Sequence, residues 1–288
     1  MKIIHLFLLI FLGFSALDST AADKVKKPVF LGHRGDREMG LQNTMSAFKG
    51  AWQNGCKGVE LDIRTTADGK MICFHDPNFS VMANDKRKVS QLTYEEILKL
   101  DIGSRKHPMF KDEKPPLLEE FFAAMPADTI VQLEIKSGAV DDSFPIKLQV
   151  LLKKYNIDQA RVYVISFEEA PLRNLNKLTP GMKNMLIVSM PACRALGMNE
   201  DNNANTIADN LIAKLKDIGC TGVSFCGSDA RIKFDASFIK KVKDAGFEFS
   251  SWTINDLYLA RKLAEMQVDY IVSDRPASLE YMWKKRFE

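Results

Sequence analysis

The sequence predicts an α/β fold in which strands and helices alternate around a closed parallel sheet, a (β/α)8 barrel. Short strand-like apolar runs begin near residues 29, 59, 130, 162, 185, 222, 247 and 269, and helical patterns separate most of them. The chain has 288 residues and is 46% hydrophobic. One barrel of about 250 residues fits this length, and a second full domain does not.

The first residues have the pattern of a secretory signal peptide, which we place at residues 1–22. Lys2 supplies the positive start, the stretch from Ile3 to Ala16 is almost entirely apolar, and small residues precede Asp23. The apolar stretch is shorter than the roughly 20 residues that span a bilayer as a helix. We therefore expect an exported protein, periplasmic or secreted, with a mature chain of residues 23–288 and no stable membrane anchor.

The first barrel unit begins with a strand that ends at His33 and continues with a helix that starts at Asn43 or Thr44 and stops at Gly55. The second strand covers residues 58–63. An Ala-Asp-Gly turn at residues 67–69 then predicts a hairpin with residues 70–75. If residue 66 pairs with residue 70, Asp62 lies opposite Phe74.

The alternation is interrupted once, by a polar insertion at residues 77–115 with one short helical run, Thr93–Leu100. After it the pattern returns. We predict helices at residues 117–125, 143–155, 168–177, 205–217, 235–245, 255–265 and 277–285, and strands at 130–135, 161–166, 185–189, 222–225, 247–252 and 269–273.

Three carboxylates stand near the ends of two strands that we expect to be neighbours. Glu60 and Asp62 share one face of the second strand because side chains alternate along a strand, and Glu134 ends the strand after the insertion. Clustered acids repel one another, and a hard divalent cation with oxygen ligands, Mg²⁺ or Ca²⁺, relieves this repulsion. The alternative is an ion network in which Arg64 or Lys136 neutralises the acids.

Two histidines flank this acidic cluster, His33 at the first strand end and His75 after the hairpin. Near neutral pH one imidazole can hold a proton while another lacks it, so the pair suits acid and base catalysis. His5 lies in the predicted signal peptide, and His107 lies in the insertion, where we expect a loop residue.

Further residues at strand ends suit an anionic substrate. Arg34 and Lys136 supply a planar donor fork and a point charge, as an anionic substrate requires, although either can instead neutralise the acids. Trp252 forms either an apolar wall of the site or part of the barrel core. Ser166 and Asp274 also end strands, in agreement with the rule that barrels carry their chemistry there.

Composition excludes some classes of partner. Lys and Arg total 40 against 37 acids, and the net charge of +3 is spread along the chain, so we expect a small-molecule substrate and no nucleic acid. The oligomeric state is left open. The spacing of the five cysteines matches no disulfide framework or zinc motif, and any disulfide pairing is left open.

These motifs also carry a resemblance. The order His33-Arg34-Gly35, Asn43-Thr44, VELDIRTTADGK at residues 59–70 and Phe74-His75-Asp76 resembles the glycerophosphodiester phosphodiesterase family, whose fold is a TIM barrel. The similarity continues through Leu133-Glu134-Ile135-Lys136 and ends near residue 277.

The resemblance implies a metal-dependent hydrolysis of glycerophosphodiesters to glycerol 3-phosphate and an alcohol. It assigns His33 and His75 to catalysis, places the metal ligands at Glu60, Asp62 and Glu134, and implies that Arg34 and Lys136 contact phosphate.

One position departs from the family, which usually has Glu where this chain has Gln42. The amide keeps the shape of the side chain and loses its charge, and nearby Glu38 is a candidate to compensate. A catalytically silent ligand-binding barrel therefore stays open. A phospholipase or lyase acting on intact lipid headgroups also stays open; it would need exposed apolar residues around the mouth of the site, and Met82, Met109 and Phe110 of the insertion are too few to decide. The roles of the two histidines and the identity of the nucleophile, water or a substrate hydroxyl, also stay open.

Overall fold

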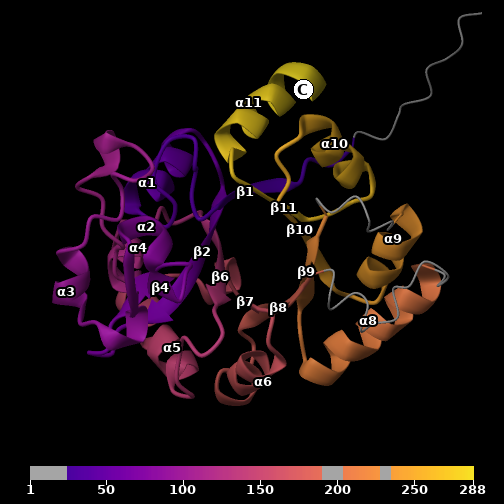
Figure 1. Cartoon of the computed structure of the whole chain (residues 1–288). Coiled ribbons are helices and arrows are strands. Elements are labelled where there is room, and N and C mark those ends of the chain that lie inside the picture. The colour runs from indigo at the N-terminus through magenta and orange to yellow at the C-terminus, as the bar shows by residue number, and fades with distance from the viewer. Residues whose placement is uncertain (1–24, 190–203, 228–234) are drawn as a thin grey trace, which may run out of the picture.

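Eight parallel strands form a closed barrel in the computed structural model, which describes residues 25–189, 204–227 and 235–288 (Figure 1). Neighbouring strands pair in chain order, and the last strand pairs with the first to close the ring. The strands are β1 Val29–His33, β2 Gly58–Thr65, β6 Ile130–Ile135, β7 Val162–Ser166, β8 Lys183–Val188, β9 Gly222–Cys226, β10 Glu248–Trp252 and β11 Tyr270–Ser273. All eight predicted strands are present, and the predicted (β/α)8 barrel is confirmed.

Helices surround the barrel and bury their apolar faces against it (Figure 1). They are α1 Met45–Gln53, α4 Leu118–Ala124, α5 Phe144–Lys154, α6 Glu169–Leu178, α8 Ala204–Ile218, α9 Ala236–Asp244, α10 Leu257–Glu265 and α11 Pro276–Phe287. Each predicted helix lies within two residues of these bounds, because the spacing of apolar residues determines which face of a helix can be buried. Side chains such as Leu31, Ile165 and Met185 fill the inside of the barrel.

The predicted hairpin is confirmed. Strand β3 (Met71–Cys73) runs antiparallel to β2, the Thr66 N–H donates to Lys70 O at 2.9 Å, and the Phe74 N–H donates to Asp62 O at 2.9 Å. Strand β2 continues to Thr65, beyond the predicted end at residue 63, because its last residues pair with β3.

The insertion at residues 77–115 holds more structure than the one helical run that we expected. It contains β4 Asn78–Phe79, α2 Ser80–Ala83, β5 Asp85–Lys88, α3 Tyr94–Leu98 and the 3-10 turns Val89–Gln91 and Pro108–Phe110. Helix α3 corresponds to the predicted run and is capped by Thr93. The other pieces are too short to show a periodicity, and their own apolar cluster, which includes Phe74, Phe79 and Met82, holds them on the barrel.

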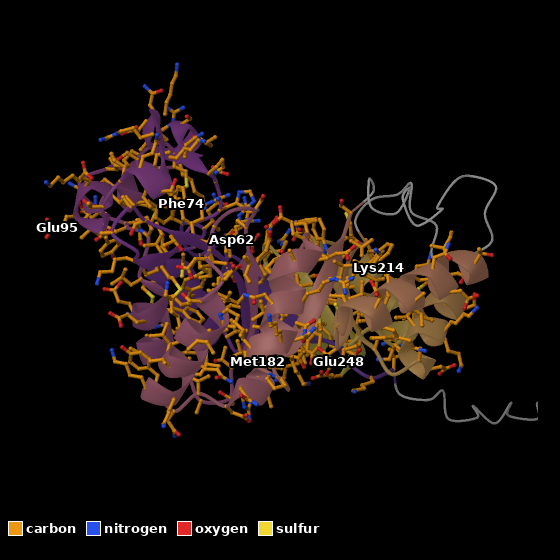
Figure 2. All side chains as sticks on the ribbon, turned by 90° about the horizontal axis from the view of Figure 1, so that it is seen from below. Asp62, Phe74, Glu95, Met182, Lys214 and Glu248 are labelled. Carbon is orange, nitrogen blue, oxygen red and sulfur yellow. The ribbon has the colours of Figure 1, made fainter. Side chains whose placement is uncertain are left out.

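The two ends of the barrel differ. Asp62 lies toward one end, and Met182 and Glu248 lie toward the other (Figure 2). At the second end, where the strands begin, Glu248 accepts hydrogen bonds from Tyr163 Oη and Lys183 Nζ, both at 3.0 Å. This network covers the amino ends of the strands, so the charged residues at the carboxyl ends remain the candidates for chemistry.

Some sequence predictions concern residues outside this description. The predicted signal peptide at residues 1–22 and Cys193 both lie outside the described residues. Cys56, Cys73 and Cys220 are buried as thiols. Within the described ranges, no helix has both the length and the apolar character needed to cross a membrane.

Candidate active site

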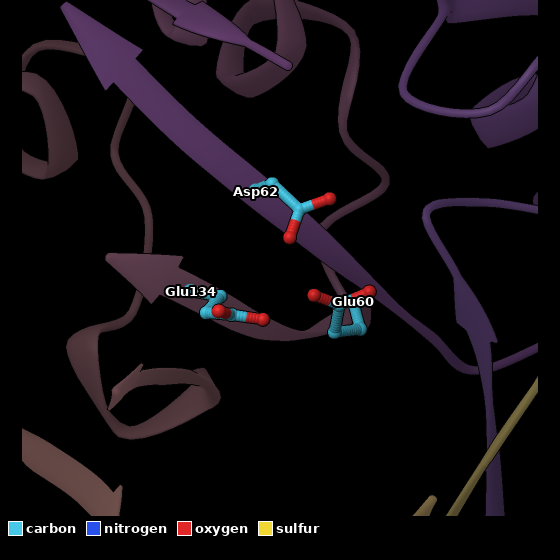
Figure 3. A group of neighbouring side chains, drawn as sticks. All are labelled: Glu60, Asp62 and Glu134. Atoms are coloured by element: carbon cyan, nitrogen blue, oxygen red, sulfur yellow. The ribbon is translucent and has the colours of Figure 1, made fainter. Parts of the chain in front are cut away.

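The three predicted carboxylates meet at the carboxyl ends of β2 and β6. Asp62 lies beside Glu134 in the parallel register, and Glu60 lies two residues earlier on β2. One carboxylate oxygen from each residue lies within 4.8 Å of the others, and all three side chains are buried (Figure 3). The strand register therefore brings together acids that are far apart in the sequence.

Two basic side chains partly neutralise this cluster. Lys136 Nζ lies 2.9 Å from Asp62 Oδ1 and 2.6 Å from Glu134 Oε1, and Arg34 Nε lies 3.2 Å from Asp62 Oδ2. Lys136 therefore neutralises part of the acidic charge, as one of the two sequence alternatives predicted. Arg64 does not pair with these acids, because its Nε donates to the backbone oxygen of His75 at 2.8 Å.

Two cations do not balance three buried acids. Burial and the nearby charge of Asp62 raise the pKa of Glu134 to about 7 and hold the pKa of Glu60 well above its usual range. Burial would also raise the pKa of Asp62, but the charges of Lys136 and Arg34 hold it below its usual value. The uncompensated negative charge and the oxygen donors fit a hard divalent cation.

Arg34 is held in place by its backbone and its side chain. Its backbone has φ of 59°, in the left-handed region, and its N–H donates to Glu60 Oε2 at 3.0 Å. Its Nη1 donates to Gln42 Oε1 at 2.9 Å. Gln42 therefore orients Arg34 without placing a carboxylate beside it. Glu38 does not take the place of the missing acid, since it pairs with Arg275 at 3.2 Å.

Both histidines bind a carboxylate through Nδ1. His33 Nδ1 lies 2.7 Å from Asp274 Oδ1, and His75 Nδ1 lies 2.7 Å from Asp76 Oδ1. Because Nδ1 is occupied, Nε2 is the nitrogen of each ring that is left for a ligand in the pocket. Burial lowers the pKa of His33, and the hydrogen bond to Asp274 partly offsets this effect.

The site has supporting residues that sequence reasoning did not assign to it. Asp274 also accepts hydrogen bonds from Arg37 Nη1 at 2.5 Å and Asn255 Nδ2 at 2.9 Å. Asn43, expected as a helix cap, instead donates to Asp62 Oδ2 at 2.6 Å, and Thr44 takes the cap position. The strand-end position of Asp274 was a signal for its role, but its pairing with His33 depends on the ring closure of β1 and β11.

The pocket beside these residues has an empty volume of about 490 Å³. One part of its lining is charged and includes Arg34, Lys136 and both histidines. Another part is apolar and includes Trp252 and Phe167, whose rings meet edge to face at 5.9 Å. Trp252 therefore borders the pocket. The lining residues are His33, Arg34, Glu60, His75, Gln132, Glu134, Lys136, Ile165, Phe167, Ile187, Ser224, Trp252 and Val272.

A closed parallel barrel with acids, cations and histidines at the carboxyl ends of its strands is the arrangement of a TIM-barrel enzyme. Residues 33–278 match the glycerophosphoryl diester phosphodiesterase family. The chain is 31% identical over 265 residues to a glycerophosphodiester phosphodiesterase of Caldanaerobacter subterraneus subsp. tengcongensis, covering 90% of this chain and 99% of that protein. The chain therefore belongs to the glycerophosphoryl diester phosphodiesterase family, a family of phosphoric diester hydrolases, as its motifs predicted.

Solved structures show the same fold. A phosphodiesterase of Oleispira antarctica, solved with its product sn-glycerol-3-phosphate, aligns with a TM-score of 0.75 at 24% identity, covering 90% of this chain and 97% of that one. A putative glycerophosphoryl diester phosphodiesterase of Agrobacterium tumefaciens aligns with a TM-score of 0.76 at 20% identity, covering 90% and 98%. These similarities agree with the barrel described above.

Proposed function

We propose that this enzyme hydrolyses glycerophosphodiesters to glycerol 3-phosphate and an alcohol by two-histidine acid and base catalysis at a divalent cation site. The observation that carries the proposal is the convergence of three buried acids, two cations and two carboxylate-bound histidines on one pocket. The family to which the chain belongs and the name of its relative from Caldanaerobacter subterraneus support the same substrate class.

Glu60, Asp62 and Glu134 would hold the cation, Mg²⁺ or Ca²⁺. When bound, such a cation offsets negative charge on a phosphoryl group. Arg34 and Lys136 line the same pocket and bind phosphate oxygens, the first through a planar fork and the second as a point charge. Gln42 keeps the guanidinium of Arg34 oriented while it does so.

The histidines move the protons of the reaction. One Nε2 accepts the proton of the nucleophile, and the other donates a proton to the oxygen of the departing alcohol. Asp274 and Asp76 hold the two rings by their Nδ1 atoms, so each Nε2 keeps its orientation. A nucleophilic water gives glycerol 3-phosphate directly, whereas a neighbouring hydroxyl of the glycerol gives a cyclic phosphodiester first, and analysis of early products distinguishes the two.

The other functions have less support. An enzyme acting on intact lipid would need exposed apolar side chains around the pocket. Met82 of the insertion is only 8% exposed, and Met109, which is 72% exposed, is not among the residues that line the pocket. A silent barrel would be expected to lose parts of its site. Here both histidines, the acids and the cations converge on it.

The test is turnover of a panel of glycerophosphodiesters and intact phospholipids, with and without chelator. We expect hydrolysis of the glycerophosphodiesters, loss of activity in chelator and recovery with Mg²⁺ or Ca²⁺. Full activity in excess chelator would contradict the cation, and turnover of intact phospholipids alone would favour the lipid enzyme. No turnover of either class would favour the silent barrel.

We also propose that the protein is exported, on the basis of the apolar pattern of residues 1–22. Fractionation of the native host and sequencing of the amino terminus of the mature protein test this proposal. A new amino terminus at Asp23 in the periplasm or medium would support it, and an intact Met1 in the cytoplasm would contradict it.

A further inference from the structure

A second groove lies between the loop after β1 and the insertion, with an empty volume of about 700 Å³. Its lining carries three basic side chains, Arg37, Arg105 and Lys106, and no acidic one. Like charges close together are costly unless an anion balances them. Asp274 balances Arg37, and Lys106 donates to two backbone oxygens, so Arg105 is the basic group of this lining that remains for an anion.

The basic side chains are arranged in different ways. Lys106 Nζ donates to the backbone oxygens of Arg37 at 3.0 Å and Gly40 at 2.9 Å, so it fixes the loop to the insertion. Burial lowers the pKa of Lys106, and the nearby charge of Arg37 lowers it further. Arg105 is exposed at the groove, where its guanidinium can contact a ligand.

The remaining lining of the groove is mostly apolar. Leu41, Met82 and Ile102 belong to the apolar cluster of the insertion and are at most 8% exposed. The lining also includes the neutral amide of Gln42, and a glutamate there would place an acid beside the basic groups. A ligand with both carbon atoms and a negative charge suits this combination.

Two contacts connect the groove with the active site. Gln42 lines the groove and accepts the hydrogen bond of Arg34, which lines the active-site pocket. Arg37 lines the groove and donates to Asp274, which holds His33. The groove thus lies one side chain away from Arg34 and Asp274, on the side of the active site that holds His33 and Arg34.

We propose that this groove binds the leaving alcohol of the substrate when that alcohol carries a second anionic group such as phosphate. The inference rests on the proposed glycerophosphodiesterase function and specifies its substrate class. Arg105 contacts the second anion, the apolar floor contacts the carbon atoms of the alcohol, and the basic lining disfavours a cationic alcohol such as choline.

The test compares two substrates that differ by one phosphate: glycerophosphoglycerol and glycerophosphoglycerol phosphate. The quantity measured is the ratio of their kcat/KM values, with the second substrate in the numerator. We expect a ratio above one in the parent enzyme that falls as salt is raised, because salt screens exposed charges. Arg105→Gln should lower the ratio by about fivefold, the upper end of the effect of an exposed ion pair.

The matched control is Arg286→Gln, which removes the same charge from an exposed position in α11 outside the groove and should leave the ratio unchanged. A parent ratio near one, or a ratio that Arg105→Gln does not change, would overturn the inference while leaving the proposed function intact. Turnover of neither substrate would instead count against the proposed function.

Free inorganic phosphate carries the same charged group as the proposed leaving alcohol, so it is the alternative ligand of the groove. Inorganic phosphate is therefore added to reactions with glycerophosphocholine, in the parent and in Arg105→Gln. An effect of phosphate that disappears in Arg105→Gln, together with equal kcat/KM for the two matched substrates, would make the groove an effector site and overturn its assignment to the leaving alcohol.

Discussion

At the scale of single residues, the ionic groups of the site are oriented by neighbouring side chains that contact them. Arg34 is the clearest case, because its backbone binds Glu60, its Nε pairs with Asp62 and its Nη1 binds Gln42. The two histidines follow the same rule through their carboxylate partners, Asp274 and Asp76. Chemistry at this site therefore depends on orientation as well as on residue type.

The histidines give the first prediction. His33→Ala and His75→Ala should each lower kcat by at least the roughly 10²-fold that is typical of a lost general acid or base. A substrate with a nitrophenol leaving group needs little protonation, so it should restore turnover only in the variant that lacks the acid. The measurement is kcat for both variants on both substrates, and near-parental turnover by either variant on the natural substrate would show that its histidine is dispensable.

A second prediction concerns Gln42. In Gln42→Glu a carboxylate replaces the amide oxygen that Arg34 now contacts, so part of the guanidinium charge is neutralised before phosphate arrives. We expect tighter binding of Mg²⁺ or Ca²⁺ by calorimetry, on the order of 1 kcal/mol. We also expect a higher KM for the anionic substrate.

Gln42→Met is the control for Gln42→Glu, since it keeps much of the volume and removes the hydrogen bond without adding charge. It should raise KM with no gain in cation affinity. If Gln42→Glu leaves both the cation affinity and KM as they are in the parent, position 42 acts on neither. A rise in activity from near zero would instead reveal a silent barrel.

At the scale of elements, the loop between β1 and α1 carries much of the site. Buried Asp36 accepts hydrogen bonds from the N–H groups of Glu38 at 3.0 Å and Ala277 at 3.3 Å, so the loop is tied to the start of α11. Gly35 packs against α1, where a Cβ would lie 2.7 Å from backbone carbon and Cβ of Ala47. The position of Arg34 therefore depends on a close approach that only glycine permits.

Gly35→Ala tests this packing, with Gly55→Ala as its control. Both glycines have left-handed φ, 85° and 84°, so alanine costs each about 1–2 kcal/mol through the backbone. Only Gly35 also meets backbone atoms, because nothing lies within 4 Å of the Cβ position of Gly55. We expect Gly35→Ala to lose more thermal stability and at least tenfold in kcat/KM. Equal losses in both variants would show that the loop accommodates the methyl group.

At the scale of the whole molecule, folding buries three acids together at the carboxyl end of the barrel strands and so couples stability to pH. Glu134 has its pKa raised to about 7 by burial and by Asp62, and the pKa of Glu60 is raised for the same reasons. A carboxyl group whose pKa is higher in the folded state stabilises the fold fully below its unfolded value, 4.5 for Glu134. This contribution is lost as pH rises through about 7.

The resulting prediction is that Glu134→Gln changes the pH dependence of Tm in chelator. Between pH 5 and 8 the Tm of the parent should fall relative to that of the variant, because the parent alone must release this proton. Added Mg²⁺ or Ca²⁺ should raise the Tm of the parent more at pH 8 than at pH 5, since cation and protons compete for the same oxygens. Parallel Tm curves, or a cation effect that does not depend on pH, would contradict this account.

The amino-acid sequence by itself determined the number and order of the barrel strands and the residue types at their ends. These features are local: apolar spacing sets the period of each element, and Glu60, Asp62 and His33 end up at strand ends because of that period. The motif from His33 to His75 also sufficed to indicate the family. The secondary structure of the insertion was predicted least completely, because its short strands contain too few residues to show a periodicity.

Only the tertiary structure decided which of these residues act on one another. His33 meets Asp274, 241 positions away, because β11 closes the ring against β1. Lys136 rather than Arg64 neutralises the acids, and Gln42 rather than Glu38 holds Arg34. The physical reason is that the position of a residue at a strand end fixes only where its side chain starts. Which side chain it contacts depends on distances of a few ångströms, and barrel closure and loop packing set those distances.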